Sequence, residues 1–581
     1  MLRLLVLLSI LIPATAITQQ DDLHPYVSEL TAFELDEGTT PTYHDIVRYY
    51  EQYADHPLVQ IRTVGRTDSG HPLHEVVVAD GGTFDRASAQ ANGKAVLLIN
   101  NGIHAGEACG IDASMLLLKY LLTEGRDLLS HTVVVIVPVY NIGGCLNRGS
   151  YSRANQEGPE AHGFRGNAKN LDLNRDFVKC DSDNAKTFNK LFMKWRPQVF
   201  VDNHTSNGAD YQYVITLIAT QKDKLQPVLA RYMQDEMLPE LYASLEQGGY
   251  EMTPYVYSMQ STPDAGIKGF MDLPRYSSGY AALHHAISFM PETHMLKPCR
   301  DRVYSTLLFM KVMLQHIDSR NADIISAQQR AIAAAQAQVS WPLQYELDTT
   351  VVDTVSFKGY QAAYRPSEIT GADRLYYDRS QPYEKSIPLY NTYKPTVTVT
   401  RPQAYIIPQA YQQVAELLMI NGVELDILSH DTTMVLDMYY ITDYQSRAKP
   451  YEGHYLHYGV QTTTKRQAVQ YHSGDYVVYT DQPSASYLMH VLEPAAADSY
   501  FAWNYFDGIL MQKEHYSPYV WEDTAAELLA DDAVLRATFL AKKSSDKAFA
   551  ESPRAQLDYI YSHSPYYEST YLRYPVGRVT R

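Results

Sequence analysis

One short stretch of this chain carries two groups that could bind a metal ion. Residues 96–112 read VLLINNGIHAGEACGID, so His104 and Glu107 stand three positions apart, just after an apolar run. An imidazole nitrogen and a carboxylate oxygen are ligands that a catalytic Zn²⁺ ion accepts, and such an ion takes a third protein ligand and keeps one position for water. The chemistry therefore depends on a third ligand elsewhere in the chain.

The motif alone is weak evidence. A chain with 20 histidines contains a His-x-x-Glu about once by chance, and a second copy does occur at His490 and Glu493. Its surroundings, SYLMHVLEP, alternate between residue types, which predicts a strand with the two side chains on opposite faces. We expect only the first copy to bind metal.

The elements that must position His104 and Glu107 alternate between apolar strands and helices. The pattern predicts strands at 74–79, 95–100, 132–139, 198–202 and 286–290, and helices within 41–60, 108–122 and 183–195. Continuous apolar strands separated by helices indicate a largely parallel sheet covered on both faces. We therefore predict an α/β/α sandwich with a mixed, mostly parallel sheet.

Further polar groups follow the predicted strands at one edge of that sheet, where ligands bind in open α/β folds. His204 comes directly after strand 198–202, and Glu292 comes directly after strand 286–290. His204 is the expected third ligand, which completes an open zinc site of two imidazoles and one carboxylate. Glu292 could take a proton from the attacking water, and His294 is a weaker rival for that role.

The loop at 141–175 supplies groups that bind anions. Asn174 and Arg175 lie in the stretch NLDLNRDF, and an arginine fork with a neighbouring amide can bind a carboxylate. Arg153 and Arg165 lie upstream in the same loop. Either arginine could stabilise an oxyanion that forms during hydrolysis.

Taken together, these residues resemble the zinc metallocarboxypeptidase family, the carboxypeptidase A-like peptidases, over roughly residues 40–315. The stretch DLNRDF is the most specific part of the resemblance. The resemblance implies one Zn²⁺ ion per chain, held by His104, Glu107 and His204. The implied substrate is a peptide with a free C-terminal carboxylate.

The resemblance also implies roles for the remaining groups. Asn174 and Arg175 would bind the carboxylate of the substrate, and Glu292 would activate water. Arg153, in preference to Arg165, would stabilise the tetrahedral intermediate.

Three departures mark a divergent, bacterial-type member. Gly106 stands where many members carry an arginine before the zinc glutamate. The mobile tyrosine of the family has two candidates, Tyr276 and Tyr280, and the specificity pocket cannot be identified.

Length and composition indicate more than one domain. At 581 residues the chain exceeds the size of a single core, and its composition changes near residue 320. We predict a zinc carboxypeptidase-like catalytic domain at 17–325 and a β-rich α+β domain at 340–581, which contains a strand–helix–strand pattern at 405–427. His454 and His457 in the second domain are interpreted as structural, because their spacing on a strand separates the rings.

The amino terminus predicts export. Residues 1–16 combine a positive residue, a short apolar run and a small-x-small cleavage site, which is typical of a signal peptide. We expect a secreted or periplasmic protein with no stable membrane insertion after cleavage. The net charge of −17 argues against nucleic acid or an anionic membrane as a partner. The four cysteines contain no Cys-x-x-Cys pair, and their disulfide state stays open.

The sequence therefore predicts a secreted zinc-dependent carboxypeptidase that hydrolyses the C-terminal peptide bond. A zinc amidase or deacylase on the same scaffold, acting on cell-wall peptides or N-acyl amino acids, is the first alternative. An inactive, peptidase-like binding protein is the second. The pair Asn174 and Arg175 favours the peptidase, and the complete set of metal-binding groups argues against the inactive protein.

Overall fold

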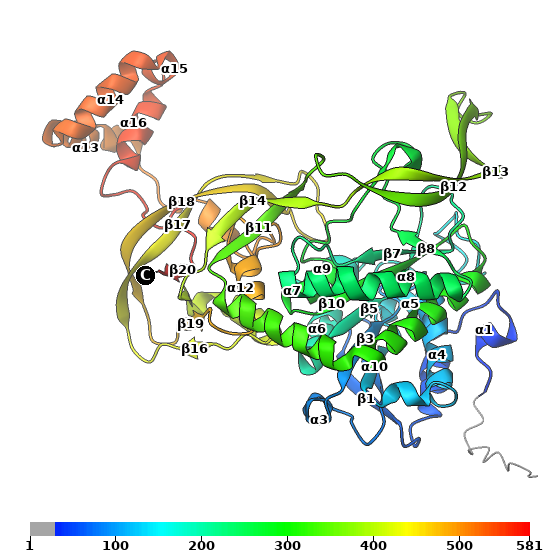
Figure 1. Ribbon diagram of the computed structural model, residues 1–581. Helices are drawn as coiled ribbons and strands as arrows, with labels where there is room; N and C mark the ends of the chain where they lie inside the picture. Colours follow the sequence, from blue (N-terminus) through cyan, green and yellow to red (C-terminus); the bar gives the residue numbers. More distant parts are fainter. Residues whose placement is uncertain (1–28, 581) are drawn as a thin grey trace, which may run out of the picture.

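A mixed nine-stranded sheet forms the centre of the computed structural model, which describes residues 29–580 (Figure 1). The predicted signal peptide at 1–16 lies outside the described residues. The strand order is β1-β2-β4-β3-β5-β10-β7-β8, and β6 pairs with β10. The strands are β1 (Val59–Arg66), β2 (Pro72–Val78), β3 (Ala95–Asn100), β4 (Thr132–Val137), β5 (Val199–Asp202), β6 (His204–Ser206), β7 (Ile215–Ala219), β8 (Met252–Pro254) and β10 (Ile287–His294).

The middle of the sheet is parallel, and the strands that border it, β2 and β7, run antiparallel to it. Strands β4, β3, β5 and β10 run parallel to one another, whereas β2 joins β4 and β7 joins β10 in antiparallel fashion. The polar residues that follow β3 and β5 therefore emerge at the same edge of the sheet. This arrangement confirms the predicted mixed, mostly parallel sheet.

Helices cover both faces of the sheet. On β3, Leu97 and Ile99 belong to one buried cluster, whereas Val96 and Leu98 belong to another, because successive side chains point to opposite faces. The first face is covered by α2 (Tyr43–Glu51), α4 (Cys109–Leu121), α7 (Pro227–Tyr232), α8 (Leu238–Gln247) and α10 (Cys299–Ala337). The second face is covered by α6 (Asp183–Trp195) and α9 (Ser277–Leu283). The α/β/α sandwich is confirmed.

The strand predicted at 286–290 is longer than expected. It continues as β10 to His294, because Glu292, Thr293 and His294 pair with β6 on one side and β7 pairs on the other. Glu292 therefore lies within a strand and does not follow one. Its backbone is held by both neighbouring strands.

The chain beyond α10 is rich in β-structure and carries a helical bundle at one end (Figure 1). Strands β11 (Ser340–Leu347) and β14 (Tyr393–Thr400) form a pair, and the long hairpin of β12 (Asp353–Pro366) and β13 (Asp373–Tyr390) adds β9 (Ile267–Lys268). A six-stranded sheet contains β15 (Ala404–Ile407), β16 (Asp426–Ile427), β17 (Thr432–Ser446), β18 (His457–Tyr471), β19 (Tyr476–Tyr479) and β20 (Gly577–Val579). With α11 (Gln412–Ile420) between β15 and β16, the strand–helix–strand prediction is confirmed.

The C-terminal region contains more helix than the predicted β-rich domain implied. Helices α13 (Pro518–Asp531), α14 (Ala533–Ser545), α15 (Lys547–Ala550) and α16 (Pro553–Ser562) form a small bundle with its own apolar core, and it projects from the rest of the molecule (Figure 1). The bundle is joined to the sheet region by the segments on either side of it.

The strand predicted around His490 is wrong. Residues Ala485–Leu492 form helix α12, because nearly all of them are buried and their side chains pack all round the helix rather than on alternate faces. His490 Nδ1 lies 2.9 Å from the carbonyl oxygen of Ser486, and Glu493 pairs with Arg578 at 3.0 Å. Each member of this second His-x-x-Glu thus has a structural partner.

The C-terminal region packs directly on the second face of the central sheet. Phe188 and Tyr280 share one buried cluster with Leu418 and Tyr487, and the rings of His284 and Tyr487 stack at 5.2 Å. Cys109, Cys145, Cys180 and Cys299 are all free and buried. Among residues 29–580, no helix combines the length and apolar character that a membrane span requires.

Candidate active site

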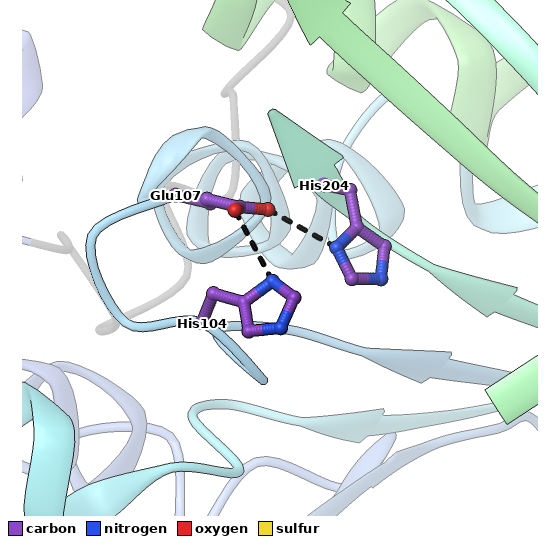
Figure 2. Close-up of side chains that lie close together, drawn as sticks. All are labelled: His104, Glu107 and His204. Atoms are coloured by element: carbon purple, nitrogen blue, oxygen red, sulfur yellow. Dashed lines mark hydrogen bonds and ion pairs between the residues drawn. The ribbon is translucent and has the colours of Figure 1, made fainter. Parts of the chain in front are cut away.

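His104, Glu107 and His204 meet at the edge of the sheet where β3 and β5 end (Figure 2). Their possible ligand atoms all lie within 4.8 Å of one another, and the three side chains are buried. Glu107 Oε1 lies 3.1 Å from His104 Nδ1, and Glu107 Oε2 lies 3.0 Å from His204 Nδ1. The structure therefore brings the three predicted ligands together.

Two aspartates orient the imidazole rings from behind. Asp172 Oδ1 lies 3.0 Å from Nε2 of His104, and Asp202 Oδ2 lies 2.9 Å from Nε2 of His204. An ionised carboxylate only accepts, so a proton on Nε2 of each ring would satisfy its aspartate and leave Nδ1, which faces Glu107, to offer its lone pair to a metal ion. Two such nitrogens and a carboxylate are the donor set of an open zinc site. These residues fit Zn²⁺.

The negative charge of Glu107 is stabilised by its surroundings. Burial alone would raise the pKa of Glu107, but His104, Arg153 and His204 hold that pKa well below its usual value. The backbone N–H of Thr205 also donates to Glu107 Oε2 at 2.8 Å. Glu107 is therefore kept as a carboxylate, the form that binds a metal ion.

Glu292 faces the same cleft from β10. Its backbone lies in register with His204 on β6 and with Thr216 on β7. Burial, together with the charge of Glu107, raises the pKa of Glu292 to about 7. A carboxyl group of that pKa can both accept and return a proton near neutral pH.

Asn174 and Arg175 lie in a short helical turn, Leu173–Arg175, at the cleft wall. The side-chain oxygen of Asn174 accepts a hydrogen bond from the backbone N–H of Ser277 at 3.0 Å. The Arg175 guanidinium donates to the Asn174 carbonyl and lies 4.4 Å from the ring centre of Tyr276. One side of the arginine is thus fixed, and its remaining donors can bind an anion in the cleft.

Both candidate oxyanion arginines line the cleft. Arg153 lies 3.1 Å from Glu107 and also donates to the Thr205 carbonyl, whereas Arg165 lies 3.6 Å from Glu107 and 2.9 Å from Asp172. Gly106 gives Arg153 its path: a Cβ atom at Gly106 would lie 2.6 Å from Arg153 Cδ. The space beside Glu107 is therefore filled by Arg153, which comes from another loop.

The cleft has a volume of about 260 Å³ and brings most of the predicted groups together. Its lining includes His104, Glu107, His204, Asn174, Arg175, Glu292, Arg153, Arg165 and Tyr276. Tyr280 is fully buried and its hydroxyl donates to Asn421, so it is not part of the cleft. His294 points to the carbonyl of Ala209 and does not line the cleft either.

Sequence reasoning missed several residues of the site. Asp202 lies two positions before His204 on an extended segment, so its place on the same face could have been inferred from strand periodicity. Asp172 lies in the same stretch as Arg175, NLDLNRDF, but its partner His104 is far away in sequence. The apolar wall had no signal at all; it consists of Ile218, Tyr255, Phe270, Met290 and Met295.

Comparison with known proteins agrees with this geometry. Residues 46–289 match the family model described as zinc carboxypeptidase. This part of the chain belongs to the zinc carboxypeptidase family. The match includes the three candidate metal-binding residues together with Asn174 and Arg175, and it ends three residues before Glu292. The enzyme is thus a metallocarboxypeptidase, a zinc-dependent hydrolase of peptides.

Individual relatives of this carboxypeptidase are distant. Carboxypeptidase 2 of Trichophyton rubrum is 20% identical over 424 residues, which cover 69% of this chain and 72% of the relative. Carboxypeptidase 2 of Trichophyton tonsurans is 21% identical over the same shares. A solved metallo-carboxypeptidase from Burkholderia cenocepacia is 14% identical with a TM-score of 0.37, over 48% of this chain and 69% of that chain.

Proposed function

We propose that this protein is a secreted or periplasmic zinc carboxypeptidase that removes one residue from the free C terminus of a peptide. One observation carries the proposal: Arg175 and the cluster of His104, Glu107 and His204 open into a single cleft. A free carboxylate bound at the arginine would bring the last peptide bond toward the metal-binding residues. Export is supported by the signal-like residues 1–16, and the activity predicts one zinc ion per chain.

His104, Glu107 and His204 would hold the zinc, which supplies a Lewis acid for the scissile carbonyl and lowers the pKa of water. Glu292 accepts a proton as the water attacks, and its carboxyl group then donates that proton to the departing amine. Because Glu292 is buried with a raised pKa, both transfers are within its range. Arg153 donates hydrogen bonds to the developing oxyanion, with Arg165 beside it.

Arg175→Ala tests whether Arg175 binds the C-terminal carboxylate of the substrate. We expect KM for a free-acid peptide to rise about a hundredfold, because a bidentate, charge-assisted contact is lost. Steady-state kinetics on one peptide as its free acid and as its C-terminal amide measure this. The wild type should cleave only the free acid. Efficient cleavage of the blocked peptide by the wild type, unchanged in Arg175→Ala, would instead support the amidase or deacylase.

The apolar wall of the cleft predicts the side chain that is released. Ile218 and Met290 face each other across β7 and β10, and Phe270 and Tyr255 complete the wall without a charged group. We therefore expect peptides that end in phenylalanine or leucine to be cleaved faster than peptides that end in lysine or aspartate.

Ile218→Asp tests that specificity. A carboxylate in the wall should lower the ratio of kcat/KM for phenylalanine over lysine about tenfold or more, because it penalises apolar groups and attracts an ammonium. Ile218→Leu is the matched control and should keep the wild-type ratio. An unchanged ratio in Ile218→Asp would place the specificity pocket elsewhere.

A further inference from the structure

Asp172 is the residue through which the parts of the active site are joined. Its Oδ1 accepts from the backbone N–H of Asn174 at 2.9 Å and lies 3.0 Å from His104 Nε2. Its Oδ2 accepts from Nε of Arg165 at 3.0 Å. Asp172 therefore contacts both a candidate metal-binding histidine and the turn that carries Asn174 and Arg175.

The main chain of Asp172 is held by the C-terminal region. Its backbone N–H donates to Glu452 Oε2 at 2.7 Å, although the two residues are 280 positions apart. Glu452 stands at the tip of a tight turn between Tyr451 and His454, whose backbone groups hydrogen-bond to each other at 2.8 and 3.1 Å. Glu452 has φ of +50° and Gly453 has φ of +86°. A turn that uses two left-handed residues presents the carboxylate from a fixed backbone.

The same turn is also anchored, through His454, to the segment that follows Arg175. His454 Nε2 lies 2.8 Å from Asp181 Oδ2, and Asp181 also binds the buried ammonium of Lys179 at 2.8 Å. The Tyr505 hydroxyl donates to the Lys179 carbonyl. The C-terminal region thus contacts residues 172–181 at both ends, on either side of the turn that carries Asn174 and Arg175.

The segment with Arg275 and Tyr276, which lies against Arg175, is held in the same way. Arg275, which precedes Tyr276, forms an ion pair with the buried Asp498 at 2.8 Å and lies 5.1 Å from the ring centre of Trp503. Tyr276 in turn lies against Arg175. Both segments that enclose the arginine therefore have partners in the C-terminal region.

We propose that the turn at 451–454 is a built-in part of the active site, and that Glu452 is a positioning residue that sets the affinity for the substrate's C-terminal carboxylate. Glu452 does not line the cleft, so it acts through Asp172. The proposal rests on the proposed function in one respect, namely that Asn174 and Arg175 bind that carboxylate. It gives the C-terminal region a role in substrate binding.

Three variants of the full-length, zinc-loaded chain test the proposal. Glu452→Ala removes the acceptor for the Asp172 N–H, Glu452→Gln keeps an oxygen there, and Glu522→Ala alters an exposed glutamate on the projecting helix α13. Binding of the product L-phenylalanine and of L-phenylalaninamide, which lacks the carboxylate, is measured by calorimetry. KM and kcat for a free-acid peptide, zinc content and thermal unfolding are measured alongside.

Glu452→Ala should weaken L-phenylalanine binding and raise KM about tenfold, with a smaller change in kcat and unchanged binding of the amide. Glu452→Gln and Glu522→Ala should match the wild type. The proposal is overturned if Glu452→Ala binds L-phenylalanine as the wild type does, or if it only unfolds at a lower temperature. A wild type that neither hydrolyses the peptide nor distinguishes the acid from the amide would refute the proposed function itself.

Discussion

Glu292→Gln is expected to lower kcat about a thousandfold while the protein still binds one zinc ion. The amide keeps the size of the carboxyl group but cannot accept a proton from water. The backbone of Glu292 is held by β6 and β7, so the substitution should leave the strand in place. Metal analysis of the purified variant, with steady-state kinetics on a peptide ending in phenylalanine, measures both quantities.

Glu160→Gln provides the matched control, because Glu160 is an exposed glutamate of the same catalytic part. It should keep wild-type kinetics and zinc content. Turnover by Glu292→Gln within tenfold of the wild type would remove Glu292 from the proton-transfer role. A loss of zinc together with activity would show instead that Glu292 supports the metal site.

The catalytic half of the fold could be predicted from the sequence because its signals are local. The apolar run before Asn100 and the short run before His204 are typical of buried strands, and strand ends in an open α/β sheet converge on one edge. The order of polar groups along the chain then predicted which side chains would meet. His104, Glu107 and His204 do meet. The position of Asn174 and Arg175 was harder to predict, because they lie in a loop whose path has no periodic sequence pattern.

The remaining parts of the site depend on contacts between distant residues, which leave no local pattern. Glu452 reaches Asp172 across 280 positions, and the spacing of His454 and His457 suggested a strand where the structure has a turn and then β18. Ile218 and Met290 form the apolar wall only because β7 and β10 pair in one particular register. Their residue types fit any buried strand.

The error at His490 has the same origin. Alternating residue types predicted a strand there, but burial on all sides by the neighbouring elements allows a helix. A local pattern is weak evidence in a short, mostly apolar segment, and tertiary packing then decides. The same four-residue motif thus lies in the candidate metal site at residue 104 and in a structural helix at residue 490.

His104→Ala and His490→Ala, compared side by side, test what separates these two motifs. His104→Ala should reduce zinc from one ion per chain to a small fraction and lower kcat/KM by at least about a thousandfold, because three protein ligands become two. It also leaves the buried carboxylates of Glu107 and Asp172 without one partner, so the chain should unfold at a lower temperature. His490→Ala should keep both zinc and activity, since its Nδ1 contacts only the Ser486 carbonyl.

These expectations are tested on both variants by steady-state kinetics, by thermal unfolding and by the zinc content measured after dialysis. Full zinc in His104→Ala would mean that the ion binds elsewhere, and the assignment of His204 and Glu107 would fall with it. Loss of zinc in His490→Ala would connect the C-terminal region to the metal in a way that its contacts do not predict. The expected contrast follows from geometry alone: at residue 104 the imidazole faces a carboxylate and a second imidazole from β6, and at residue 490 it faces its own helix.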